Sequence, residues 1–590
     1  MSMLLAVVLS LCTSTSVSFR NASLLSAPRQ GKSLEYPSFV SGNCPFQAKR
    51  KCPVSLLAGR VVPSPISFIA CAKSCANVPG IDNGDVQAWT NGLWAKFLGF
   101  KNDFTQKPSE VLSEFAKLEH LIDGIDGMQA EETFNLMERW VNSDHVKGSL
   151  RALVKKTGHY TSNLLDRATW TPYREKLWQG KKVVIVGGGP IGLRMAVEAA
   201  MLGADVTLGD ARDGWTRANV MKMWPVAKSD LESIGFKEFN LLSGDFPICN
   251  IAVMQHAMLR IALVLGVNVE IMKFKELRDN GQRQYGAVFE KNGQELPPIS
   301  FDAIFDASGV RGSLVGSKVN GKSIFNRGSD ASGSKRVAIT ANFERFREDK
   351  DKRWAYGQTS ITAVGAKYLD DKIKYGVKPR VEIRDLVWFQ SVLSNYVVMA
   401  LDLEEIQEKF PNAIKDSGVS RADLLRGNNI NFDELLKLVM EVVDDWRIPY
   451  EMEDGKPKML EGINKLAIFD FMGGGMSKDH GPEGKVSMIQ TLPSGQHVLA
   501  IGDSLRAPFW PEGTGMSRGI LSVMHAGFIL TKIWQQTGAS VEEEAKSWAY
   551  LAAYAAGEAC KNKCGDAAVK EYVLRGYRGD TPPSNFGNWM

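Results

Sequence analysis

The residues best placed to do chemistry are three glycines near the middle of the chain: Gly187, Gly189 and Gly192. An apolar run at 183–186 precedes them and a helical pattern follows, so we expect them in the turn between a strand and a helix. Gly187 permits the tight turn, Gly189 leaves room for a pyrophosphate beside the backbone, and Gly192 lets the helix pack closely on the strand. The free N–H groups of the first helical turn would bind the phosphates. The motif predicts a dinucleotide site.

Asp210 supplies the second part of this motif. It lies 23 residues after Gly187, at the end of a short predicted strand at 206–208, where a carboxylate can accept hydrogen bonds from a ribose. Three polar residues that follow could reach cofactor phosphate or ribose: Arg212, Arg217 and Asn219. The alternative is an ordinary turn of a parallel sheet, and the pattern alone does not separate FAD from NAD(P).

A second strand–turn–helix pattern lies more than 300 residues later. A predicted strand at 498–501 leads to Asp503, which could bind a ribityl chain, and a Pro/Gly loop at 508–515 precedes a long apolar helix. Between the two patterns, a predicted strand at 301–306 ends in a small-residue turn that contains Gly309. One dinucleotide held by turns so far apart in sequence is typical of a flavoprotein.

The elements that must position these turns divide the chain into six segments. We expect a targeting leader at 1–80, a helical lead-in at 81–180, a first part of an FAD-binding domain at 181–335, a substrate domain at 336–465, a second FAD-binding part at 466–535 and a helical C-terminal tail at 536–590. Three β-branched runs predict a mostly antiparallel sheet in the substrate domain: 337–343, 380–389 and 396–401. Four further elements are expected: an amphipathic helix at 254–266, a helical region at 403–446, a strand at 466–471 and a loop up to about 490.

Charge is distributed unevenly. The net charge of +5 arises in residues 1–80, which hold eight basic residues and one acid, Glu35. The rest of the chain holds 63 basic and 65 acidic residues, a net charge of −2. The body therefore gives no electrostatic argument for a nucleic acid or an acidic lipid surface as partner.

The first 80 residues have the composition of a targeting leader. An apolar run at 3–12 is too short to span a bilayer and has the form of a signal-peptide core. The following segment, 19–80, is rich in Ser, Pro, Lys and Arg, as transit peptides are. Together they resemble the bipartite leader of proteins that enter complex plastids, with simple secretion or a mitochondrial leader as alternatives. We expect a plastid protein without a transmembrane span in its mature form.

Cysteine and histidine usage argues against a disulfide framework and against a metal centre. Five of the eight cysteines lie in residues 1–80, and only Cys249, Cys560 and Cys564 remain, which is a reduced, intracellular pattern. The seven histidines are scattered and form no HxH or HxxxH pair. No bound metal is expected.

The motifs taken together resemble the flavin monooxygenase domain of the MICAL family, whose members oxidise methionines of actin. The matching stretches occur in the same order over roughly residues 130–535. They are VVIVGGGPIGLR at 183–194, the spacing of Asp210 and Arg212, TRANVMKMWP at 216–225, ALVLGVNVEI at 262–271, VAITANF at 337–343, AIFDF at 467–471 and GDSLRAPFWPEGTGMSRG at 502–519. The last stretch is the most specific.

The resemblance implies an α/β fold: a Rossmann-like FAD-binding domain of the glutathione-reductase type with an inserted β substrate domain. It implies FAD as cofactor and NADPH, or NADH, as diffusible reductant. One oxygen atom would pass through a flavin C4a-hydroperoxide into a small molecule or a protein side chain. The implied cofactor contacts are Gly187, Gly189, Gly192, Asp210, Arg212, Arg217, Asn219, Gly309 and Asp503.

Two loop residues are the candidates for a catalytic role. Trp510 matches an aromatic residue of the family's loop near the flavin ring, and Glu512 stands where the family has Met. The sequence departs from the family again at Ser308, where Asp is usual, at Ala218 in place of Asn and at Ala252 in place of Arg. Together with the plastid-type leader, the lack of a legible actin-facing surface argues against actin as substrate.

Two other functions remain open. One is a different flavoprotein reaction, such as that of a reductase, an epoxidase or a peroxide-producing oxidase. The other is a binding protein that keeps the fold without catalysis, for which only the changes at Ser308 and Glu512 argue.

Overall fold

The computed structural model describes part of the second of two compact units, Cys52–Met590. The described residues are 54–57, 60–63, 107–116, 160–214, 219–236, 240–241, 247–281, 284–310, 312–329, 336–344, 361–364, 380–383, 385–390, 394–415, 427–460, 465–469, 475–478, 480, 487–506, 515–535, 569–570, 573–574 and 576–577. Within them, no helix combines the length and the apolar character that crossing a membrane requires.

A six-stranded sheet forms the centre of the molecule, in the order β25-β26-β13-β3-β4-β8. Its strands are β25 (Ile489–Thr491), β26 (His497–Ala500), β13 (Ala303–Asp306), β3 (Lys182–Val186), β4 (Asp205–Asp210) and β8 (Asn268–Ile271). All neighbours from β26 to β8 are parallel, whereas β25 is antiparallel to β26. The carboxyl ends of β3, β4, β13 and β26 therefore meet at one edge, which is where open α/β sheets bind their ligands.

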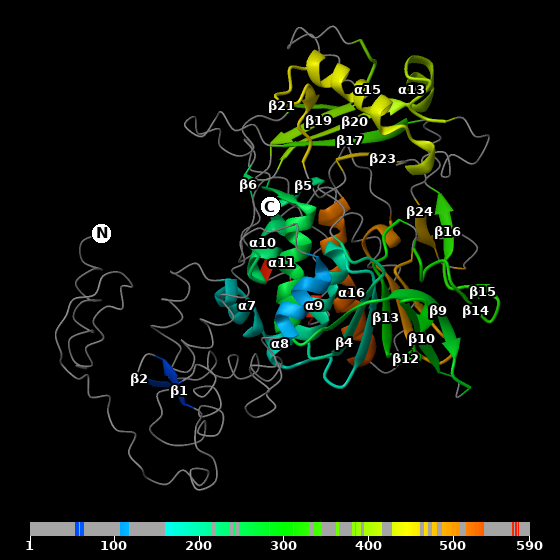
Figure 1. The fold of residues 1–590 in the computed structure, drawn as a ribbon. Helices are drawn as coiled ribbons and strands as arrows, with labels where there is room; N and C mark the ends of the chain where they lie inside the picture. Colours follow the sequence, from blue (N-terminus) through cyan, green and yellow to red (C-terminus); the bar gives the residue numbers. More distant parts are fainter. Residues whose placement is uncertain are drawn as a thin grey trace, which may run out of the picture. The chain divides into compact units, whose positions relative to one another are not determined.

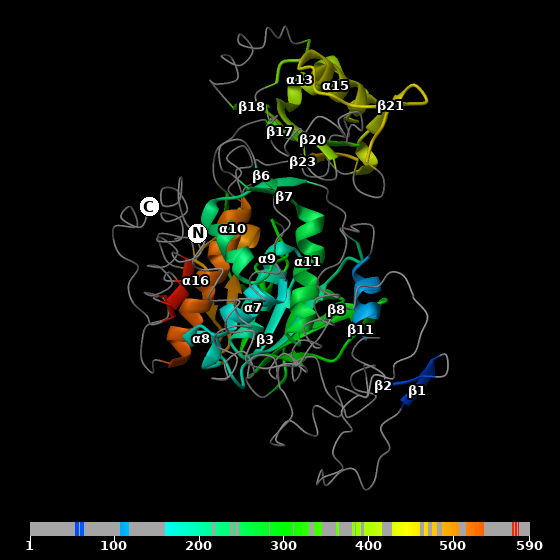
Figure 2. The same cartoon turned by 90° about the vertical axis from the view of Figure 1, so that its left-hand side faces the viewer.

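Helices bury this sheet. The chief ones are α9 (Pro190–Met201), α11 (Ile251–Val264) and α16 (Gly515–Gln535), and Figure 2 shows α9 and α11 side by side over β3. The helix expected at 254–266 corresponds to α11. The prediction that it is amphipathic is wrong, because every residue of α11 after Ile251 is buried. Even Gln255, His256 and Arg260 lie inside. The parallel sheet with these helices is the predicted Rossmann-like α/β fold.

An antiparallel sheet that the sequence patterns did not predict occupies the connection between β8 and β13. It contains β9 (Lys273–Asp279), β10 (Tyr285–Lys291), β11 (Gln294–Glu295) and β12 (Ile299–Ser300), with β10 at its centre. β11 and β12 have only two residues each, and β9 consists mostly of charged residues, so the strand pattern is weak in sequence.

A second, entirely antiparallel sheet has the order β18-β19-β20-β17-β23. Its strands are β18 (Ile361–Val364), β19 (Asp385–Gln390), β20 (Ser394–Asp402), β17 (Arg336–Glu344) and β23 (Leu466–Phe469). Alternate residues of β17, such as Ile339 and Phe343, pack with helix α15 (Phe432–Asp445) in one core. Figure 1 shows α15 and α13 (Leu403–Lys409) along this sheet. Side chains alternate between the two faces of a strand, and the apolar residues of α15 lie along one face of the helix. The apolar face of the sheet and that of α15 therefore pack against each other.

The structure corrects four predictions in this region. β23 was expected in the second FAD-binding part, but it pairs with β17 and so belongs to the antiparallel sheet. The described residues of the predicted helical region at 403–446 form two separate helices, α13 and α15, with an isolated bridge between Ile414 and Ile430. The strand expected from 380 begins only at Asp385. The expected loop up to about 490 includes two strands, β25 and β24 (Gly475–Lys478), and the latter pairs with β16 (Asn326–Ser329).

Both terminal segments contribute described elements. In the expected lead-in, residues 108–116 are helical, followed by α7 (Tyr160–Ala168) and α8 (Thr171–Arg174). In the expected leader, the structure describes only an antiparallel pair, β1 (Val54–Leu57) and β2 (Arg60–Pro63), so the targeting prediction lies almost wholly outside the described residues. Near the C-terminus, the described helical residues Val569, Val573 and Tyr577 belong to the same hydrophobic core as the six-stranded sheet.

Candidate cofactor site

The turn after β3 has the geometry that the glycine motif predicted. Gly187 adopts a φ of +107°, a region that side chains disfavour. A Cβ atom on Gly187 would lie 2.6 Å from the carbonyl oxygen of Ala307, the residue that follows β13. Two turns of the sheet edge therefore touch at a point where only glycine fits.

Gly192 and Gly189 differ in what surrounds them. A Cβ on Gly192, in the first turn of α9, would lie 1.9 Å from the carbonyl oxygen of Gly187, so this glycine permits close packing of helix on strand. A Cβ on Gly189, the N-cap of α9, would meet no heavy atom of the described residues within 4 Å. The N-terminus of α9 thus opens onto free space, which is what an approaching pyrophosphate requires.

Asp210 lies at the tip of β4 beside this space. Its carboxylate accepts hydrogen bonds from the backbone N–H groups of Gly188 (2.7 Å) and Arg212 (2.8 Å). The Arg212 side chain is 52% exposed, with Nε 3.7 Å from Asp210 Oδ1. A carboxylate has about four acceptor positions, so two remain for ribose hydroxyls. On the other side of the turn, Gln255 of α11 donates to the carbonyl of Gly188 (3.3 Å).

The turn after β13 is organised by a buried carboxylate that the sequence patterns did not single out. Asp306 Oδ1 accepts bonds from the backbone N–H (2.9 Å) and hydroxyl (2.7 Å) of Ser308. Asp306 Oδ2 accepts bonds from the backbone N–H groups of Leu314 (2.8 Å) and Val315 (2.6 Å). Ser308, where the resemblance expects Asp, therefore has a defined role in this chain: its hydroxyl completes the turn.

The same carboxylate reaches the turn after β26. The hydroxyl of Ser504 donates to Asp306 Oδ1 (2.9 Å) and also lies 2.9 Å from the carbonyl oxygen of Gly309. Asp503 is the preceding residue, in the 3-10 turn η3 (Gly502–Ser504), and is partly buried. Gly309 and Asp503, predicted from separate stretches, are thus brought to adjoining turns.

Helix α16 joins the first and last motifs. Gly519 lies against Ile191 of α9: a Cβ on Gly519 would lie 2.5 Å from Ile191 Cδ1. The N–H of Gly502, which has a φ of +58°, donates to the Ser522 hydroxyl on the next turn of α16 (3.0 Å). Gly502 and Gly519 therefore both leave room for Ile191, so the N-terminal parts of α9 and α16 lie close together.

Residues 515–519 also match the GxSxG pattern of a hydrolase nucleophile elbow. The context does not fit, because Ser517 lies in the first turn of α16 and is fully buried. Its hydroxyl accepts a hydrogen bond from the N–H of Trp224 (2.9 Å). The serine is a structural link between α16 and helix α10 (Pro225–Ser233), not an exposed nucleophile.

Asn219 connects the cofactor-binding domain to the antiparallel sheet. Its side-chain amide nitrogen lies 3.2 Å from the hydroxyl of Tyr396 on β20. Tyr396 belongs to a small apolar cluster with Phe389 and Val398 of the sheet and Val220, which follows Asn219. The other predicted site residues, Arg217, Trp510 and Glu512, lie outside the described residues.

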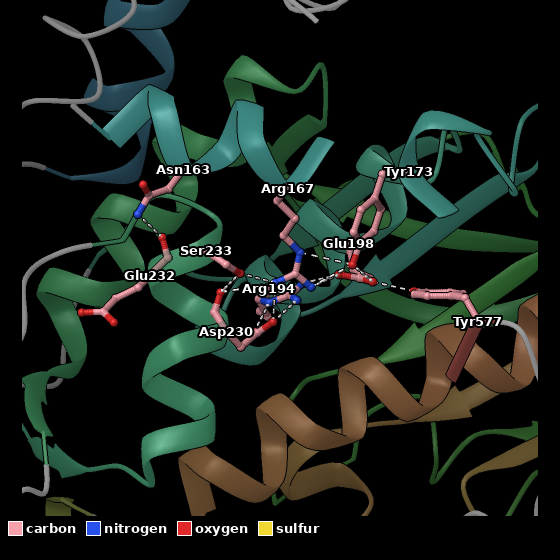
Figure 3. A network of polar contacts seen from close by, with 9 residues as sticks. All are labelled: Asn163, Arg167, Tyr173, Arg194, Glu198, Asp230, Glu232, Ser233 and Tyr577. Atoms are coloured by element: carbon pink, nitrogen blue, oxygen red, sulfur yellow. Dashed lines mark hydrogen bonds and ion pairs between the residues drawn. The ribbon is translucent and has the colours of Figure 1, made fainter. Parts of the chain in front are cut away.

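A buried cluster of charged residues joins α9 to the neighbouring helices α7 and α10 (Figure 3). Its members are Arg167, Tyr173, Arg194, Glu198, Asp230, Ser233 and Tyr577. Arg194 and Glu198, one turn apart on α9, form an ion pair (2.8 Å), and Arg194 also pairs with Asp230 of α10 (2.8 Å). Arg167 of α7 pairs with Asp230 as well (2.6 Å). Two cations and two anions, all fully buried, balance each other.

Both carboxylates of this cluster remain ionised. Burial alone would raise the pKa of Asp230, but the guanidinium groups of Arg194 and Arg167 outweigh it and lower that pKa to about 2. The same balance of burial against the two cations lowers the pKa of Glu198. The cluster was missed because α9 reads as an apolar helix, although a charged pair four residues apart in such a helix is a usable signal.

The described residues contain no group of three or more His, Cys, Asp or Glu side chains that could hold a metal ion. Cys249 is buried, and its thiol donates to the carbonyl oxygen of Asn250 (3.3 Å). The described site offers the N–H groups of an open helix N-terminus, a carboxylate that can accept from a ribose, and three turns tied together. These groups suit a phosphate-containing dinucleotide.

Comparison with known proteins shows which proteins the chain is similar to. The pyridine nucleotide-disulphide oxidoreductase family model matches residues 141–231. The F-actin monooxygenase MICAL2 of Rattus norvegicus is 28% identical over 441 residues, which cover 72% of this chain and 21% of that protein. The protein-methionine sulfoxide oxidase mical3b of Danio rerio is 27% identical over 372 residues, covering 61% and 21%. The chain thus spans about one fifth of the length of these curated relatives.

A solved structure of a triple mutant of the flavin-dependent brominase Bmp2 aligns with 69% of this chain and 98% of its own, at 14% identity and a TM-score of 0.41. The sequence relatives confirm the predicted resemblance to the MICAL-type flavoprotein monooxygenase domain. They also confirm the class of that domain, the FAD-dependent oxidoreductases.

Proposed function

We propose that this chain, which carries a flavoprotein monooxygenase domain of the MICAL type, is an FAD-dependent monooxygenase that uses NADPH or NADH as reductant. The observation that carries the proposal is the joining of three turns at one sheet edge. Gly187 touches Ala307, and Ser504 bonds to Asp306, so the ends of β3, β13 and β26 form one continuous surface. In an extended form, FAD would run along all three turns, and the resemblance to flavoproteins favours it over a diffusible NAD(P) at this position.

The residues of the chain would hold FAD as follows. The N–H groups at the start of α9, which face open space at Gly189, would bind the pyrophosphate. Asp210 would accept the hydroxyls of the adenosine ribose, and Asp503 would bind the ribityl chain. When bound, FAD would accept a hydride from NAD(P)H and activate O2 for transfer of one oxygen atom.

The antiparallel sheet would bind the substrate. Its face around Tyr396, Phe389 and Val398 is buried against Val220, next to Asn219 of the cofactor-binding domain. A site bounded by such apolar side chains excludes water, which protects an activated oxygen from wasteful reactions. The Asn219–Tyr396 pair supplies two polar groups at this boundary, which could orient a small molecule or a protein side chain.

We propose a substrate other than actin. The relatives are named for F-actin and protein methionine, but the chain matches only about a fifth of their length. Its first 80 residues have the composition of a plastid-directing leader, so we propose a plastid location, with the secretory pathway or the mitochondrion as alternatives. The balanced charge of the remaining chain gives no support for a nucleic-acid partner.

Spectroscopy with NADPH titrated in air tests this function. The purified chain should contain bound flavin, consume NADPH and O2 together and, with its substrate, place one atom of labelled oxygen in the product. Stoichiometric hydrogen peroxide without labelled product would instead indicate an oxidase. Protein that binds no FAD would refute the proposal, and bound FAD that neither NADPH nor NADH reduces would favour a non-catalytic protein.

A further inference from the structure

The C-terminal segment forms part of the cofactor-binding domain. Val569, Val573 and Tyr577 are all buried in the same hydrophobic core as the six-stranded sheet. Their spacing of four residues places them on one face of a helical segment. Nearby, the Lys570 ammonium group lies 5.5 Å from the ring centre of Trp170. The expected C-terminal tail therefore has a docking face with a defined binding site on the domain.

The docking site is shaped by two glycines. A Cβ on Gly527 of α16 would lie 2.4 Å from the hydroxyl of Tyr577, and a Cβ on Gly576 would lie 2.3 Å from the ring of Phe528. The rings of Tyr577 and Phe528 pack edge to face with their centres 4.8 Å apart. Each partner thus lacks a side chain where the other has an aromatic ring, which is the complementarity of a specific contact.

The Tyr577 hydroxyl reaches through this contact into the buried charge cluster, where it donates to Glu198 Oε1 (Figure 3). The same oxygen accepts a bond from the Tyr173 hydroxyl (2.8 Å). The other carboxylate oxygen, Oε2, pairs with Arg194 (2.8 Å) and Arg167 (3.4 Å). A buried carboxylate needs all its partners, because removing one leaves desolvated charge without compensation.

Glu198 and Arg194 lie on the cofactor helix itself. Arg194 follows Gly192 by two residues, and the N-cap of α9 is Gly189, where the pyrophosphate would bind. One side of α9 is fixed by the contact of Gly192 with the turn after β3. The opposite anchor is the charge cluster, in which Tyr577 is the only described member that comes from the C-terminal segment.

We propose that Tyr577 is a positioning residue for the cofactor: the docked C-terminal segment holds α9 through Glu198 and so tightens the binding of FAD. The choice of FAD as the ligand rests on the proposed function, whereas the contact between Tyr577 and Glu198 does not. The segment is thereby a built-in partner of the cofactor-binding domain, and undocking it would weaken flavin binding without touching any residue that contacts the flavin.

The test compares Tyr577→Phe with the full wild-type chain. The substitution keeps the ring that packs on Phe528 and removes only the hydroxyl. Tyr450→Phe is the control, because it removes a phenol hydroxyl that donates to Asp444 of α15 (2.8 Å), in the other domain. Two quantities are measured well below the unfolding temperature: amide hydrogen exchange of residues 187–201 in the FAD-free chain, and the Kd for FAD by flavin fluorescence.

We expect Tyr577→Phe to speed exchange in α9 and to raise the Kd for FAD by about three- to tenfold, with both unchanged in Tyr450→Phe. Unchanged exchange and unchanged Kd in Tyr577→Phe would overturn the proposal. Equal effects in both variants would also overturn it, since they would reflect general stability. If the wild-type chain binds no FAD, the proposed function fails, and exchange in α9 alone then decides whether Tyr577 positions this helix.

Discussion

The hydroxyl of Ser504 donates a hydrogen bond of 2.9 Å to the buried carboxylate of Asp306, across 198 residues of sequence. This bond fastens the turn after β26 to the turn after β13, and Asp503 is held one residue away from it. The glycine turn after β3 meets the same edge through Gly187 and Ala307. A cofactor site made from distant segments depends on such cross-connections, because no local sequence can fix the distance between the turns.

Replacing Asp306 by Asn should unfold the turns and weaken cofactor binding. Asp306 accepts five hydrogen bonds, from the backbone of Ser308, Leu314 and Val315 and from the hydroxyls of Ser308 and Ser504. An amide would lose the charge and direct N–H groups at these donors, so we expect a loss of about 2–4 kcal/mol in the free energy of unfolding. Chemical denaturation measures this.

Asp302→Asn is the control for that variant. Asp302 accepts the N–H of Lys182 (2.7 Å) at the opposite, amino-terminal end of the same strands, in an exposed position. Its replacement should cost less than about 1 kcal/mol, because an exposed hydrogen bond is easily replaced by water. Equal losses in the two variants would show that Asp306 has no special role.

Alanine at Gly189 and at Gly192 should have different consequences. At Gly192 the added Cβ would meet the Gly187 carbonyl oxygen, so α9 must shift, and we expect a loss of folded protein. At Gly189 the added Cβ meets only open space, so the protein should fold normally but bind FAD roughly tenfold or more weakly, because the methyl group takes up space the pyrophosphate needs. Thermal unfolding and FAD titration separate these outcomes. Normal FAD affinity in Gly189→Ala would place the phosphates elsewhere.

Tyr396→Phe should affect oxygen transfer more than cofactor binding. The substitution removes the hydroxyl next to Asn219 and leaves the ring in its apolar cluster. We expect a Kd for FAD within about twofold of wild type, since one neutral hydrogen bond at a distance from the phosphates is lost. The fraction of NADPH oxidation that yields peroxide should rise. An unchanged product yield would exclude the pair from the oxygen-transfer step.

His525 predicts a pH dependence of stability. Burial in α16 lowers the pKa of this histidine from 6.5 to about 4. Between these values the unfolded chain binds a proton that the folded chain does not, so stability rises with pH across this window and falls as the pH drops from about 6.5 to 4. The full effect is roughly 3 kcal/mol. His525→Gln should flatten the dependence, measured by urea unfolding at pH 7, 5.5 and 4. A slope unchanged in the variant would assign it to other groups.

The sequence predicted the parts of the site whose geometry is local. Gly187 and Gly192 are required by a positive φ and by a 1.9 Å approach, and such constraints leave a fixed spacing of glycines. The parallel strands themselves were predicted from short apolar runs, such as 183–186 and 498–501, but their order in the sheet was not. Asp210 was predicted for the same reason, because it ends the strand next to the turn.

Contacts between distant segments could not be predicted in this way. Ser504, which donates to Asp306, lies 198 residues away from it in the sequence. Tyr577, which donates to Glu198, lies 379 residues away from it. Sequence patterns do not show where a residue lies in three dimensions. The charged residues of α9 therefore look like interruptions of an apolar helix, although they form a buried cluster. β23 was placed in the wrong domain for the same reason, since its partner β17 precedes it by more than a hundred residues.

The central claim is that three turns form one flavin site. A crystal structure of the chain, from crystals grown in the presence of FAD, tests this claim most directly. The account predicts FAD in an extended form, with the adenosine ribose at Asp210, the pyrophosphate at Gly189 and the ribityl chain at Asp503. A nicotinamide dinucleotide bound at the Gly187 turn in preference to FAD, or FAD bound away from Asp503, would contradict it.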